Sequence, residues 1–209
     1  MICLLLFINN YILKLNYNHH IMTKSTLLNI AIFVCRISLG FFIFLFIGLT
    51  TIFVHIQIDK NFYKDKEVEF NVSEFNYASI GKSKTSNAID SEVYTIGNIV
   101  IGSLYFMYIK YSAILVLLFL SFKEFKKIML SVKKLSTFKN NNIISFKRIG
   151  SFAFLYFLVS SFYFIQFEDG AYSGFTISFA PLIIMLLSFI MAEIFREGNL
   201  LLKDNELTI

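Results

Sequence analysis

The stretch Phe122–Arg148 reads FKEFKKIMLSVKKLSTFKNNNIISFKR and lies between hydrophobic segments. It holds a single acid, Glu124, among many basic residues. The basic residues are Lys123, Lys126, Lys127, Lys133, Lys134, Lys139, Lys147 and Arg148. Short loops rich in Lys and Arg stay on the cytoplasmic side of a membrane, because these residues resist translocation. The stretch therefore predicts a cytoplasmic loop, and this loop fixes the side of every other segment.

The composition is that of a membrane protein. Hydrophobic residues make up 56% of the 209 residues, and the mean hydropathy is +0.67. Several apolar runs are long enough to cross a bilayer. The net charge of +5 is concentrated in the basic stretch, which favours anionic lipid headgroups as its partner over direct binding of nucleic acid. The two cysteines, Cys3 and Cys35, indicate no structural disulfide.

The order of apolar and polar segments predicts an all-α integral membrane protein with four transmembrane helices and both termini in the cytoplasm. The predicted segments are an N-terminal tail (1–26), a first helix (27–58), an extracytoplasmic insert (59–94), a second helix (95–122), the basic loop (123–148), a third helix (149–167), an outside turn (168–174), a fourth helix (175–196) and a cytoplasmic tail (197–209). Met22 is the expected true start, because Met22–Ser25 directly precedes the first apolar run.

Two of the connecting segments have a periodicity of their own. Glu67–Phe75 alternates apolar and polar residues, which predicts one or two short strands in the insert. From Phe122 to Phe138, apolar residues recur at intervals of three and four. This spacing predicts a basic amphipathic helix at the membrane surface, and Asn140–Asn142 is expected to break it.

The fourth predicted helix holds the only proline, Pro181. A proline inside a helix removes one hydrogen bond, so the Ile177 carbonyl is expected to need another partner. Gly174, Ser178 and Ala180 predict a patch of small residues where helices approach closely.

Lys110 lies near the middle of the second predicted helix. An ionisable group at that depth normally faces the bundle interior or water, so Lys110 is a candidate functional residue. Its expected partners are the hydroxyls of Ser160, Ser161 or Ser178, a backbone carbonyl, or a bound anion. The alternative is a lysine that reaches toward the headgroups or packs on neighbouring tyrosines.

Arg36 and Glu193 are expected at similar depth in the first and fourth helices, and a pair between them would lock the two helices together. The alternative is a pair between Glu193 and Arg196 on one helix. His19 and His20 are adjacent but lack a third ligand, so no metal site and no cofactor is predicted.

The last half of the chain resembles a known family. Its fourth helix closes on Ala192-Glu193-Ile194-Phe195, followed by Gly198 and the ending Leu207-Thr208-Ile209, and Ile144–Gly150 reads ISFKRIG. These features resemble the bacterial membrane family catalogued as domain of unknown function 2975, over about Ile99–Ile209. The resemblance implies four helices with both ends in the cytoplasm, a location in the bacterial cell membrane and no established activity. It also implies a small helix-turn-helix regulator encoded nearby.

The sequence contains no H-E-x-x-H, G-x-S-x-G, P-loop or C-x-x-C motif, so we do not expect an enzyme. We expect a membrane-anchored regulatory or interaction protein. It would use the outside insert as a sensor and the basic loop and acidic tail as a cytoplasmic docking surface. A small helix-turn-helix regulator is one expected partner, and a homo-oligomer of the chain is another expected assembly. The tail residues expected to dock are Arg196, Glu197, Asp204 and Glu206. The alternative is a subunit of a small oligomeric transporter or channel that uses Lys110.

Overall fold

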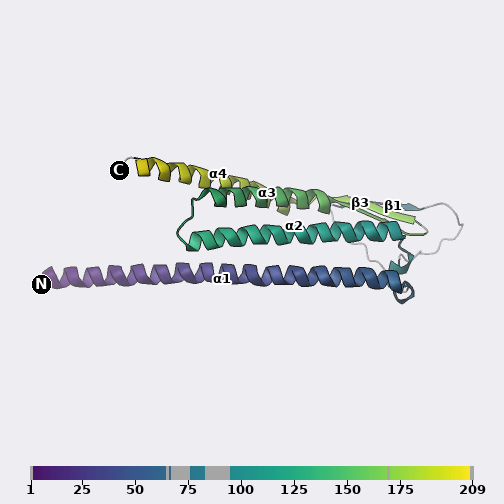
Figure 1. Cartoon of the computed structure of the whole chain (residues 1–209), viewed down its shortest axis with the longest axis horizontal. Coiled ribbons are helices and arrows are strands. Elements are labelled where there is room, and N and C mark those ends of the chain that lie inside the picture. The colour runs from purple at the N-terminus through teal and green to yellow at the C-terminus, as the bar shows by residue number, and fades with distance from the viewer. Residues whose placement is uncertain (1, 65, 67–75, 83–94, 169, 208–209) are drawn as a thin grey trace.

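The computed structural model describes residues 2–64, 66, 76–82, 95–168 and 170–207, and side chains at fewer of them, beginning at Thr26. Four long helices dominate the chain (Figure 1). They are α1 (Ile2–Ile58), α2 (Ile101–Lys133), α3 (Asn140–Ser161) and α4 (Phe179–Leu207). Two short 3-10 helices, η1 (Asn61–Tyr63) and η2 (Ile96–Asn98), precede α2. His19, His20 and the expected start at Met22 lie before the described side chains.

Each long helix contains a segment long and apolar enough to cross a membrane. These segments are Thr26–Ile58, Ile101–Lys133, Asn140–Ser161 and Phe179–Asp204. The prediction of four membrane-spanning helices is therefore confirmed by length and composition, and the chain is a multi-pass membrane protein.

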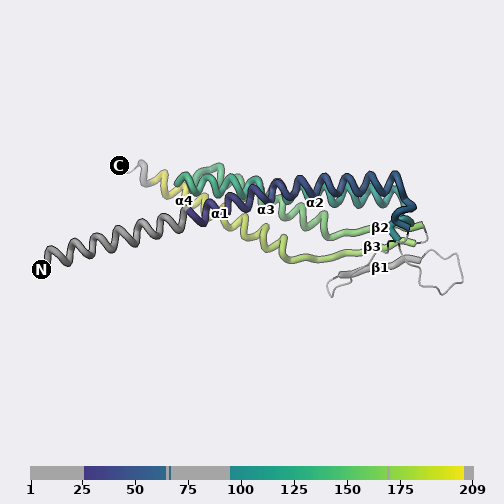
Figure 2. Tube along the Cα trace, turned by 90° about the horizontal axis from the view of Figure 1, so that it is seen from below, coloured from purple at the N-terminus to yellow at the C-terminus, as the bar shows by residue number. Residues whose placement is uncertain are grey.

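The helices pack in chain order, α1 on α2, α2 on α3 and α3 on α4. In Figure 1, α2 and α3 lie between α1 and α4, and Figure 2 shows the same bundle turned by 90°. The α2–α3 turn and the last residues of α4 meet at one end of the bundle, where Lys133 also donates to Asn29 of α1. We call this the basic end. The strands lie at the opposite end, the sheet end.

The sheet end departs from the all-α prediction. Strands β1 (Asn76–Lys82), β2 (Phe162–Gln166) and β3 (Gly170–Thr176) form an antiparallel sheet in the order β1-β3-β2. The third helix thus ends at Ser161 rather than at residue 167, and strand β3 replaces most of the predicted turn at 168–174. Periodicity cannot separate a short apolar strand from a buried helix, and the aromatic run after Ser161 favours the strand.

Two hydrogen bonds connect the sheet to the start of α2. The Val100 amide donates to the Gln166 carbonyl at 2.9 Å, and the Gln166 amide donates to the Ser103 hydroxyl at 3.0 Å. An apolar cluster fills the space beside them: Ile56, Ile99, Leu104, Phe167 and Tyr172. Burial and a hydrogen bond with Tyr163 raise the pKa of Tyr172 to about 12. The strands predicted at 67–75 lie outside the described residues.

The prediction of a separate amphipathic helix at the basic end is wrong. Helix α2 runs without a break from Ile101 to Lys133, so the basic segment continues the second span and is not a separate surface helix. Ile128 packs within the bundle and is only 1% exposed, whereas Phe125 stays exposed. Asn140–Asn142 begins α3 and does not break a helix. The predicted tail from residue 197 continues α4 to Leu207.

Pro181 lies in the first turn of α4, which begins at Phe179. The first four amides of a helix have no partner within it, so a proline here removes no helical hydrogen bond. The prediction that the Ile177 carbonyl loses a helical partner is therefore wrong, because residue 177 precedes the helix.

The predicted patch of small residues also differs from the expectation. Gly174 lies in β3 and meets the Tyr163 ring across the hairpin, so the close approach there is between strands.

Candidate interaction site at the basic end

Glu124 is the centre of the contact between α2 and α3. Its side chain is only 8% exposed. One carboxylate oxygen lies 2.6 Å from the Lys127 amine and 3.4 Å from the Arg148 guanidinium. The other accepts a hydrogen bond of 2.7 Å from the Ser145 hydroxyl. Both oxygens of a buried, acceptor-only group are thereby satisfied by partners on two helices.

Sequence reasoning noted Glu124 as the single acid of the basic stretch but did not assign it a role. The signal for that role was present. An acid that follows an apolar span, with Lys127 one turn later, sits among several positive charges and is attracted by all of them. Its partners on α3 depend on the hairpin geometry, which spacing along one helix does not give.

The turn between α2 and α3 holds a leucine in an unusual conformation. Leu135 has φ 56°, the left-handed region that favours glycine or asparagine. Its side chain is 86% exposed, and Lys133 and Lys134, both exposed, precede it. The turn therefore holds an apolar side chain out of the bundle at a cost of about 1–2 kcal/mol in backbone energy.

A polar network holds this turn in place. The buried Asn142 amide donates to the Ser131 hydroxyl at 2.8 Å and to the Thr137 carbonyl at 2.6 Å. Ser131 in turn donates to the Ser136 carbonyl at 2.7 Å. The Ser136 amide also donates to the Ser131 carbonyl at 3.1 Å, so the backbone bonds that end α2 and these side-chain bonds together fix the Leu135 conformation.

Helix α4 braces the same turn from the other side. The Asn199 amide donates to the Phe138 carbonyl, and a Cβ at Gly198 would overlap the Phe138 ring. Next to this contact, Phe195 packs on Phe138 and on Phe146 of α3. The three helices thus form one packed unit at the basic end.

Some of the residues that carry the family resemblance meet in this unit, namely Ala192, Phe195 and Gly198 of α4 and Phe146 and Gly150 of α3. Ala192 and Phe195 share an apolar cluster with Ile143 and Phe146, and a Cβ at Gly150 would lie 3.1 Å from the Phe189 ring. The motif of the last helix and the entry into the third helix are therefore two sides of a single helix–helix contact. Glu193 and Ile194 of the same motif are exposed and lie outside this contact.

The predicted docking residues lie on the outer side of α4. Arg196 pairs with Glu193 and lies 3.4 Å from Glu197, and all three side chains are more than half exposed. Asp204 is also exposed, and the side chain of Glu206 lies outside the described residues. Exposed ion pairs of this kind contribute about 0–1 kcal/mol to stability.

Arg36 and Glu193 are not brought together. In the described part of the chain, Glu193 pairs with Arg196, the alternative that the sequence left open. The first and fourth helices are separated because α1 packs on α2 and α4 packs on α3. Arg36 lies exposed on α1.

Lys110 donates to the carbonyl of Phe162, where α3 gives way to β2. This is the backbone-carbonyl partner among those expected from the sequence. The last carbonyls of a helix lack partners within it and carry negative partial charge, so a lysine is well suited to this position. The Lys110 amine also lies 5.9 Å from the Tyr111 ring centroid. These contacts tie α2 to the start of β2.

Residues 79–209 match the family described as protein of unknown function (DUF2975), which is more than half of the chain. The match begins at Ser79, inside β1, and so extends the resemblance seen from about Ile99. Comparisons with the curated proteins and with the solved structures give no match.

Proposed function

The chain belongs to the DUF2975 family of proteins of unknown function, and we propose that it is a membrane-anchored interaction protein whose basic end docks a regulatory partner. The basic end would face the cytoplasm of a bacterial cell, since Lys and Arg outnumber the single acid Glu124 across Phe122–Arg148. The membrane-spanning helices would serve as the anchor.

The exposed Leu135 is the observation that carries this proposal. Backbone strain persists only where the surroundings fix it, and such residues cluster at functional sites. Here the Ser131–Ser136–Asn142 network keeps an apolar side chain exposed on a basic surface. An aliphatic anchor on a rigid element is what a binding interface requires.

The surrounding charge defines the partner. Lysines beside Leu135 favour an acidic protein surface with an apolar pocket. The partner we propose is a small helix-turn-helix regulator, which the family resemblance implies, with the α4 charges at Arg196, Glu197, Asp204 and Glu206 as a second contact. Anionic headgroups would occupy the lysines nearer the membrane, and direct contact with nucleic acid is not part of the proposal.

The test is retention of the partner from native membranes in mild detergent, followed by mass spectrometry. Leu135→Asn removes the apolar side chain but keeps a residue suited to the left-handed conformation. We expect it to lose the partner while its thermal midpoint stays equal or rises. Leu135→Met is the matched control and should retain the partner.

Retention of the partner by Leu135→Asn at the wild-type level would contradict the proposal. Recovery of the chain alone, as a defined oligomer, would instead point to the transporter or channel alternative. In that alternative, Lys110 would be essential for flux. The described contacts of Lys110 with the end of α3 do not favour it.

A further inference from the structure

The contact between α1 and α2 brings two cations to the same level of the bundle. The Lys133 amine donates to the Asn29 side chain at 2.6 Å, and this bond relates the two antiparallel helices to each other. Seven residues nearer the sheet end on each helix are Arg36 of α1 and Lys126 of α2. Seven residues make about two helical turns and return to nearly the same face. Arg36 and Lys126 therefore lie at one level, on the two sides of the α1–α2 contact.

Further contacts between these helices agree with this placement. The Phe42 and Phe122 rings meet with their centroids 5.3 Å apart, and Lys126 interacts electrostatically with the buried Cys35. Cys35 directly precedes Arg36. The half-buried Lys126 is thus directed to the part of α1 that carries the second cation.

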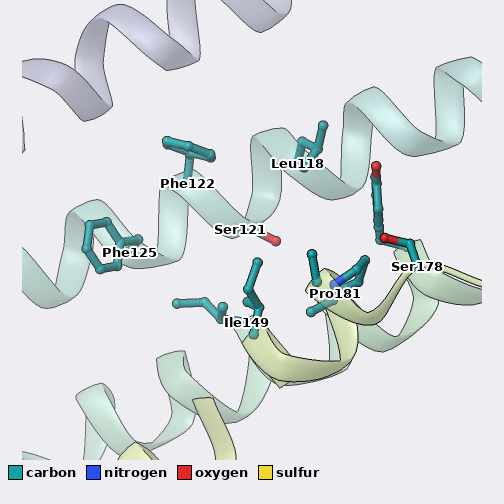
Figure 3. Close-up of a pocket in the computed structure, with 11 residues that line it drawn as sticks. Leu118, Ser121, Phe122, Phe125, Ile149, Ser178 and Pro181 are labelled. Atoms are coloured by element: carbon teal, nitrogen blue, oxygen red, sulfur yellow. The ribbon is translucent and has the colours of Figure 1, made fainter. Parts of the chain in front are cut away.

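Neither helix offers an acid to these two cations. Helix α1 contains no Asp or Glu, and the single acid of α2, Glu124, is bound by Ser145 on the α3 side. Phe125, between Glu124 and Lys126, lines an apolar pocket that α2 forms with α3 and α4 (Figure 3). Among the described residues, no ion pair joins Arg36 or Lys126 to a carboxylate. Two like charges at one level repel each other, so an anion between them would stabilise this contact.

The two cations lie where the apolar part of each helix ends. After Arg36, residues 37–58 of α1 contain no Asp, Glu, Lys or Arg and extend about 33 Å, enough to cross the hydrocarbon core. On α2, the uncharged run that follows Lys110 ends at Phe122, and Lys123 is the first cation after it. The level of the two cations is therefore that of the lipid phosphates in one leaflet.

We propose that Arg36 and Lys126 together bind the phosphate of one anionic phospholipid at the α1–α2 contact. A guanidinium donates two parallel hydrogen bonds to a phosphate, and the lysine ammonium adds a second positive charge. A headgroup without a cation, such as that of phosphatidylglycerol, suits this pair better than phosphatidylcholine, whose choline group is repelled. The inference rests on the proposed function only in placing the basic end at a leaflet, and it assigns the headgroup contact to two residues away from the Leu135 turn.

The test uses the full chain, purified in mild detergent, with phosphatidylglycerol and phosphatidylcholine added in equal amounts. Native mass spectrometry counts the lipids that remain bound, and we expect the wild type to prefer phosphatidylglycerol. One cation near an anionic headgroup contributes a factor of about five, so Arg36→Gln and Lys126→Gln should each lower this retention about fivefold. Arg36→Lys keeps the charge and should retain most of the lipid. Lys147→Gln, which removes an exposed lysine of α3, is the matched control and should behave as the wild type.

Thermal unfolding separates lipid binding from a role in the fold. Without lipid, Lys126→Gln should keep or raise the thermal midpoint, because one of two like charges is removed. Added phosphatidylglycerol should raise the midpoint of the wild type more than that of the variant. A midpoint that falls in Lys126→Gln without lipid would show that Lys126 supports the fold itself, and this would contradict the proposal.

Two further results would overturn the site. If Lys147→Gln lost as much phosphatidylglycerol as Lys126→Gln, the charge of the whole basic end would account for the binding. If inorganic phosphate displaced the lipid at equal concentration, the ligand would be a free anion. Leu135→Asn tests the proposed function separately, because it should lose the protein partner and keep the lipid.

Discussion

The two ends of the bundle are held together by different chemistry. At the basic end, polar side chains join the helices: the buried Glu124 joins α2 to α3, the buried Asn142 fixes their turn, and the half-buried Asn199 ties α4 to it. At the sheet end, strands pair through their backbones, and an apolar cluster around Ile56 and Phe167 fills the space beside α2.

The difference has consequences for sensitivity to mutation. A buried polar group is favourable only when its partners are in place, so losing one partner leaves the others with a desolvation penalty. An apolar cluster distributes its energy over many small contacts. Single substitutions should therefore disturb the basic end most, and substitutions at the sheet end should act locally.

Glu124→Ala is the change with the largest expected effect. It leaves Ser145 without its acceptor and removes the anion between Lys127 and Arg148, so we expect the free energy of unfolding to fall by about 2–3 kcal/mol. Denaturant titration in detergent measures this loss. Glu193→Ala is the control, because its exposed pair with Arg196 contributes about 0–1 kcal/mol. Equal losses for the two variants would mean that the α2–α3 contact does not depend on Glu124.

Lys110→Met tests the sheet end and should act locally. It leaves the Phe162 carbonyl without its partner, at an expected cost of about 1 kcal/mol. Hydrogen exchange should accelerate in β2 (Phe162–Gln166) and remain unchanged in the α2–α3 turn, and Lys110→Arg, which keeps a donor, should restore protection. Faster exchange throughout the bundle would show that Lys110 supports more than this junction.

The features that follow from amino-acid composition could be predicted from the sequence. Four apolar segments and a single basic stretch gave the four candidate spans, and the ending from Ala192 onward gave the family. The strands were missed because the aromatic run after Ser161 is apolar enough to continue a helix. Hydropathy alone therefore extended the third span to residue 167.

The missed features of the basic end have a different cause. Asn140–Asn142 resembles a helix breaker, yet it forms the start of α3, where the Asn142 side chain bonds to three groups from the preceding helix and turn. The roles of Glu124 and Asn199 depend on groups that are more distant in sequence: the Ser145 hydroxyl and the Arg148 guanidinium for Glu124, and the Phe138 carbonyl for Asn199. Local patterns predict where a helix can form, and long-range hydrogen bonds decided where these helices begin and pack.

The smallest expected effects are changes in the thermal midpoint when two glycines are replaced by alanine, and these changes should have opposite signs. Replacing Gly by Ala in a helix stabilises it by about 1 kcal/mol where the methyl group has room. At Gly40 of α1 nothing lies within 4 Å of the added carbon, so Gly40→Ala should raise the thermal midpoint. At Gly198 the methyl group would overlap the Phe138 ring, and overpacking at this contact should outweigh the gain and lower the midpoint. If Gly198→Ala were as stabilising as Gly40→Ala, α4 could move away from the turn without loss, and the basic end would not be the rigid unit that the Leu135 conformation requires.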